Sequence, residues 1–188
     1  MAYDLKNVFY LGNLHEYSDS YTASGEGIAP IDVSSYVDPI SKGRSRGQGL
    51  AVYKVHCQVS TEDGTAPAAT ETASIATGLS VKPYTTTGDE LAGQIAYGDL
   101  SPSSDLLIYG AQWIGPAAAA AEGAGGMVME FCSPSKEVPY VVVRDTIYQL
   151  YATSTAQNAD ILVNYRMECA MITLDTATLN QLLRTQTA

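Results

Sequence analysis

One stretch near the C-terminus limits what this chain can fold into more than any other feature. At positions 161–173 the odd-numbered residues are mostly apolar, whereas the even-numbered ones from Asn164 onward include Arg166, Glu168 and Ala170. This period of two predicts a strand of an antiparallel sheet, with one buried face and one exposed face. In an α-helix the same residues would be spread around the whole circumference.

A second alternating stretch, positions 50–60, predicts another strand of the same kind. Its expected outward face carries Lys54, His56 and Gln58. Its expected inward face carries Ala51, Tyr53, Val55, Cys57 and Val59.

Short apolar runs between turn residues predict further strands along most of the chain. The expected strands are 17–24, 28–37, 50–60, 74–84, 105–114, 127–132, 140–144, 146–153 and 161–174. About eight to ten strands with turn signals every eight to twelve residues are typical of an all-β sandwich or barrel. Positions 116–126, with five consecutive alanines, are compatible with a short helix or with a loop of small residues.

The expected domain organisation has three parts. Residues 1–13 form an N-terminal arm, residues 14–175 form the β-sandwich domain, and residues 176–188 form a C-terminal helix or tail. For this helix, Thr176 or Thr178 is the expected N-cap, because a side-chain oxygen there can accept a bond from a free backbone N–H.

The charge balance argues against direct binding of nucleic acid. The 188 residues include 20 acidic and 10 basic side chains, a formal net charge of −10. A surface of this sign repels phosphate over most of its area. A short basic loop, 42–47, contains Arg44 and Arg46, and we interpret it as a solvated turn or a contact between subunits.

The three cysteines, Cys57, Cys132 and Cys169, lie in apolar runs and form no short-spaced pair. An odd number argues against a complete disulfide framework and favours buried free thiols. This is compatible with synthesis in a reducing cytoplasm. The N-terminal residues do not have the pattern of a signal peptide, and no apolar run is long enough to cross a membrane.

The sequence carries no recognisable catalytic, metal or cofactor motif, so we expect no enzyme activity and no cofactor. His15 and His56 have no second histidine or cysteine at metal-ligand spacing on the same strand face. No Gly-x-Ser-x-Gly motif is present, and the glycines near the basic loop lack the strand and helix that flank a phosphate-binding loop. Acidic pairs at 62–63 and 89–90 are interpreted as solvated loops.

Some residues are candidates for contacts between subunits. The expected strand 146–153 is apolar on both faces, as expected where one face meets the core and the other a partner. The pairs Arg144–Asp145 and Arg166–Glu168 suggest a cross-strand ion pair or a subunit contact. The candidate contact residues are Tyr148, Leu150, Arg144, Arg166, Glu168, Arg44 and Arg46.

These features together resemble the single jelly-roll capsid proteins of icosahedral, membrane-containing bacterial and archaeal viruses. The resemblance rests on the N-terminal arm, the Thr/Ala/Gly-rich loops and the closing block 138–174. It implies an antiparallel jelly-roll sandwich of two four-stranded sheets and a capsid shell subunit that self-assembles through lateral contacts.

The resemblance also implies the partners and the location. We expect the chain to contact copies of itself and other virion proteins, with an internal membrane or an inner protein layer beneath the shell. The expected location is the virion, after synthesis in the host cytoplasm. A phage decoration or cement protein is an alternative within this class.

A carbohydrate-binding β-sandwich is the alternative from another class. It would present exposed aromatic side chains on one face. The tyrosines that could supply them are Tyr17, Tyr21, Tyr36, Tyr84, Tyr97 and Tyr109.

Overall fold

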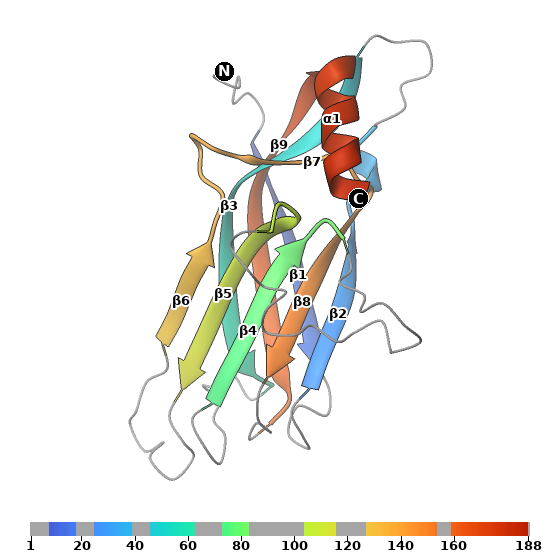
Figure 1. Ribbon diagram of the computed structural model, residues 1–188. Helices are drawn as coiled ribbons and strands as arrows, with labels where there is room; N and C mark the ends of the chain where they lie inside the picture. The colour runs from blue at the N-terminus through green and yellow to red at the C-terminus, as the bar shows by residue number, and fades with distance from the viewer. Residues whose placement is uncertain are drawn as a thin grey trace.

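The computed structural model describes residues 8–17, 25–38, 46–62, 73–82, 104–115, 127–153 and 159–187. They form two packed β-sheets and one C-terminal helix (Figure 1). The strands are β1 (Phe9–Tyr17), β2 (Gly25–Asp32), β3 (Arg46–Thr61), β4 (Ala73–Ser80), β5 (Leu107–Gly115), β6 (Met127–Cys132), β7 (Tyr140–Val142), β8 (Thr146–Thr153) and β9 (Ile161–Asp175). The helix α1 spans Thr176–Thr187.

The order of the strands is that of a jelly roll. One sheet has the order β1-β9-β3-β7 and the other β2-β8-β4-β5-β6. Apart from β6, the antiparallel pairs are nested, because β1 pairs with β9, β2 with β8, β3 with β7 and β4 with β5. One long hairpin rolled into two sheets has this arrangement. The second sheet has five strands instead of the expected four, because β6 adds to the open edge of β5.

The alternation that predicted β9 is confirmed over its first half and changes in the second. Five odd-numbered residues, Ile161, Val163, Tyr165, Met167 and Cys169, are completely buried between the sheets. Beyond Cys169 the buried residues are Ala170, Ile172 and Leu174, whereas Met171 is 49% exposed. The expectation that Met171 and Thr173 lie inside is therefore wrong, because α1 covers the opposite face of this part of β9.

A β-bulge explains why the expected inward face of β3 is only partly correct. The register against β9 shifts between Val52 and Lys54, so Tyr53 is an extra residue. Before the bulge, Val52 faces the sandwich core, while Ala51 and Tyr53 pack in the separate cluster beneath α1. After it, Val55, Cys57 and Val59 pack on the core as predicted.

The N-terminal boundary also differs from expectation. The expected limit of the arm, residue 13, falls within β1, which pairs with β9 along its whole length. Phe9 and Leu11 pack against the core, so residues 9–13 belong to the sandwich. The expected strand 28–37 ends earlier, at Asp32, whose carboxylate accepts a bond from the Ser34 amide at 2.8 Å and turns the chain into a short 3-10 helix. Most of the expected strand 17–24 and the alanine segment 116–126 lie outside the described residues.

The C-terminal helix is confirmed, but its cap is Asp175. One carboxylate oxygen of Asp175 accepts a bond from the Thr178 backbone N–H, and the other accepts one from the Thr178 hydroxyl, both at 2.9 Å. At its other end, the buried Gln186 side chain accepts from the Val143 N–H and donates to the Val141 carbonyl. The helix is therefore fixed to the strand β7 and the segment after it.

Candidate functional site

The outer face of the four-stranded sheet carries a group of polar side chains that neighbouring strands bring together. The strand pairing places His56 of β3 opposite Arg166 of β9, and Lys54 opposite Glu168. On the other side of β9, Tyr10 of β1 lies opposite Glu168. Residues from three separate parts of the chain therefore meet on one surface.

In the part of the chain that the structure describes, no ion pair links Arg144 or Asp145 with Arg166 or Glu168, so the cross-strand ion pair suggested by the sequence is not formed. The guanidinium of Arg166 lies over the ring of Tyr10, 4.0 Å from its centroid, a cation–π contact. Glu168 instead contacts His56, whose Nε2 lies 3.1 Å from a carboxylate oxygen. This hydrogen bond holds the pKa of Glu168 below its usual value, and the charges of Lys136 and Lys54 act in the same direction.

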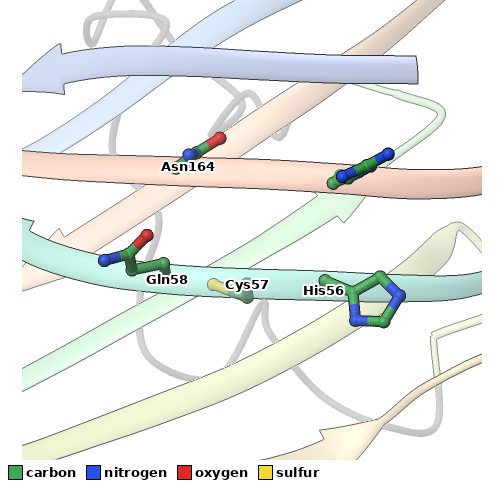
Figure 2. A pocket seen from close by; sticks show the side chains of 5 residues that line it. His56, Cys57, Gln58 and Asn164 are labelled. Atoms are coloured by element: carbon green, nitrogen blue, oxygen red, sulfur yellow. The ribbon is translucent and has the colours of Figure 1, made fainter. Parts of the chain in front are cut away.

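A shallow hollow of about 190 Å³ lies beside these residues. Figure 2 shows His56, Cys57 and Gln58 along β3, with Asn164 next to them on β9. Arg166 completes the lining. Amide, imidazole and guanidinium groups give this hollow several hydrogen-bond donors for a ligand's acceptor oxygens.

Cys57 does not provide a nucleophile at the hollow. Burial raises the pKa of its thiol to about 12, so the thiol is protonated at neutral pH. All three cysteines are free, and burial also raises the pKa of Cys169 to about 12. Within the described ranges, no three His, Cys, Asp or Glu side chains lie together in a group that could hold a metal ion.

The strand β6 is a second candidate surface, and its residues are not among the contact residues expected from the sequence. It forms the edge of the five-stranded sheet and pairs with β5 (Figure 1). Four of its six side chains are large, apolar and exposed: Met127 at 56%, Val128 and Met129 at 43%, and Phe131 at 37%. A short strand that is apolar at consecutive positions, without alternation, was the signal in the sequence.

Several predicted contact residues have partners within the chain. Leu150 is completely buried and packs with Ala152 and Tyr148 in a cluster of the five-stranded sheet that is separate from the main core. Thus a partner is not needed to explain why β8 is apolar on both faces. Arg144 donates to the Gln186 carbonyl at 3.0 Å, and so holds the end of α1.

The basic loop is only partly described. Arg46 is the first residue of β3, is exposed and lies opposite Asp175. Arg44 lies outside the described residues.

The aromatic face expected of a carbohydrate-binding sandwich is not made by the described tyrosines of that set. Tyr17 and Tyr109 are both buried in the core, at 7% and 0% exposure. Tyr36 stacks on Phe9 with ring centroids 5.0 Å apart. Tyr21, Tyr84 and Tyr97 lie outside the described residues.

Comparisons with known proteins give remote structural likenesses only. No protein-family model matches the chain, and no curated protein matches it. Among solved structures, VP1 of Merkel cell polyomavirus in complex with 3'-sialyllactosamine is similar at 8% identity and a TM-score of 0.44, over 90% of this chain and 96% of that one. The same VP1 with disialyllactose gives 8% and 0.43 over the same shares. VP1 of human polyomavirus 12 with 3'-sialyllactosamine gives 6% and 0.39, over 90% of this chain and 100% of that one.

The class to which the chain belongs is therefore defined by its own topology: it is a jelly-roll β-sandwich. None of the helices in the described ranges is long and apolar enough to span a membrane.

Proposed function

We propose that this protein is a non-enzymatic virion structural protein, a capsid shell subunit that self-assembles through lateral contacts between copies. The main support for the proposal is that β6, an edge strand of the jelly-roll sandwich, exposes large apolar side chains. Jelly rolls are used in viral shells, and also in lectins and cupins, so the fold alone does not distinguish these functions.

An exposed apolar edge strand favours an assembling protein over a monomeric one. Soluble monomers protect their sheet edges with charges, proline, bulges or covering segments, because unpaired backbone groups attract other strands. Here Met127, Met129 and Phe131 are exposed on β6, and Glu130 is its one charged residue. Covering these side chains with a partner removes apolar surface from water, at about 25 cal/mol per Å².

The opposite side of the sandwich offers a complementary surface. In the five-stranded sheet, β2 and β6 are the two ends, and β1 packs beside β2. On β1, Tyr10 and Leu14 are 55% and 61% exposed. Two different apolar edges on opposite sides suit a head-to-tail contact, which repeats from copy to copy and closes into a ring when the rotation between copies allows it.

The expected partners follow from the charge and from the assembly. The net charge of −10 disfavours direct contact with the genome. We therefore propose an internal membrane or an inner protein layer beneath the shell, together with other virion proteins, as in the membrane-containing viruses named above. The location is the virion, after synthesis in the host cytoplasm.

Electron microscopy and sedimentation velocity of the purified protein test the proposal. We expect shells, sheets or tubes, and a Met127→Lys/Met129→Lys variant that remains folded but sediments as small species. Val138→Lys is the matched control, because Val138 is 74% exposed and lies outside the strands. A wild-type protein that stays monomeric at all concentrations contradicts the proposal. Binding of discrete small oligomers to a preformed shell would instead identify a decoration or cement protein.

A further inference from the structure

One surface of this acidic chain is locally basic. Lys54, His56 and Arg166 lie beside Glu168 on the outer side of the four-stranded sheet, and Lys136, between β6 and β7, is close enough for its charge to lower the pKa of Glu168; we call these four basic residues the basic patch. Three of the ten Lys and Arg residues of a chain with a net charge of −10 are gathered here. The patch is therefore a local exception in the charge distribution.

Arg166 is held in place but has donors to spare. The face of its guanidinium lies on the Tyr10 ring, which restricts the side chain without using its N–H groups. Among the described residues, Arg166 has no hydrogen-bond or ion-pair partner. Glu168, the nearest candidate, is engaged by His56. A guanidinium held in this way presents two parallel N–H donors in one plane, which match the two oxygens of a carboxylate.

The hollow beside Arg166 has the composition of a carboxylate site. The volume of the hollow, about 190 Å³, is large enough for a side-chain carboxylate with some water. Gln58 and Asn164 face each other across the β3–β9 pair, so their amide groups can bond the oxygens that Arg166 does not reach. The His56 side chain is 47% exposed, so the site is open to a partner approaching from outside.

We propose that the basic patch is a contact site for a second copy of this chain, with an acidic side chain of that copy entering the hollow against Arg166. This inference rests on the proposed function, since it names one contact of the same assembly. The net charge of the chain favours a second copy as the occupant. Copies carrying −10 each repel one another, and a contact in which opposite charges meet offsets part of this repulsion and fixes the orientation of the two copies.

Charge-changing variants with a matched control test the inference by sedimentation velocity at about 50 mM and about 500 mM NaCl. Arg166→Glu should raise the protein concentration needed for assembly by about ten-fold or more at low salt. Arg166→Lys, which keeps the positive charge but loses the paired N–H donors of the guanidinium, should have a smaller effect. Arg184→Glu makes the same change of charge on an exposed residue of α1 and should have no such effect.

The outcomes separate the inference from the proposed function. If the wild type assembles and Arg166→Glu behaves like Arg184→Glu, the inference is overturned while the capsid proposal stands. If the wild type does not assemble at all, both fail. If hexaglutamate binds the wild type but not Arg166→Glu, while assembly is insensitive to Arg166, the site takes a different acidic partner, and the commitment to a second copy is wrong. Circular dichroism of each variant confirms that it is folded.

Discussion

A buried hydrogen bond between the two sheets gives the sharpest test of how the sandwich is held together. The Thr77 hydroxyl of β4 donates to the Leu150 carbonyl at 2.8 Å, and its oxygen lies 2.6 Å from the Tyr165 hydroxyl of β9. Because the threonine has one hydroxyl hydrogen and uses it on Leu150, the tyrosine is the donor in the second bond. Thr77 and Tyr165 are both completely buried.

Removing the donor or the acceptor of this bond should therefore lower the free energy of unfolding by different amounts. Tyr165→Phe removes the phenol oxygen and leaves Thr77 still bonded to Leu150, so we expect a loss of about 0.5–1.5 kcal/mol in the free energy of unfolding. Thr77→Val leaves the buried Tyr165 hydroxyl without its Thr77 acceptor and should cost about 1–3 kcal/mol. The double variant should cost less than the sum of the two single changes, because they act on the same bond.

Urea unfolding measures these differences, with fluorescence of the single tryptophan, the buried Trp113, as the signal. Unchanged urea dependence (m-value) across the four proteins is the control for two-state behaviour. A Tyr165→Phe variant that is less stable than Thr77→Val, or strictly additive losses, would refute this account of the bond.

Three other outcomes are expected. The His56–Glu168 contact stabilises the fold at pH values above the pKa of a glutamate in the unfolded chain, near 4.5. Its contribution is lost as the pH falls through the lower pKa of Glu168 in the folded protein. The free energy of unfolding in urea, measured between pH 7 and pH 3, should therefore depend less on pH for Glu168→Gln than for the wild type. Burial keeps Cys57 and Cys169 protonated, so both should resist iodoacetamide at pH 8 in the native protein, whereas mass spectrometry should find three labelled thiols after denaturation, and fewer than three would indicate a disulfide. Leu179→Ala truncates the best-buried apolar side chain of α1 and should cost about 2–3 kcal/mol in thermal or urea unfolding, whereas replacing the exposed Arg184 by Ala should change stability by less than about 0.5 kcal/mol.

The partners of Arg166 and Glu168 could not be predicted from the sequence. Arg166 and Glu168 were identified as outward residues of a strand, and that is where they lie. Their partners, Tyr10 and His56, are more than 100 positions away in the chain, and only the register of β9 against β1 and β3 brings them together. The alternation of one strand contains no information about which strand lies beside it or in which register.

The sequence by itself determined that this chain is an antiparallel β-sandwich, with β6, β8 and α1 close to their observed limits. Periodicity and turn residues suffice for this, because a strand's burial pattern is local. The tertiary structure decided what depends on neighbours: the nested jelly-roll pairing, the bulge at Tyr53, and the reversal of the buried face of β9 under α1. It also decided that Leu150 is internal whereas Met127 and Met129 are exposed. All three residues are apolar in sequence, and burial depends on which surface the rest of the chain covers.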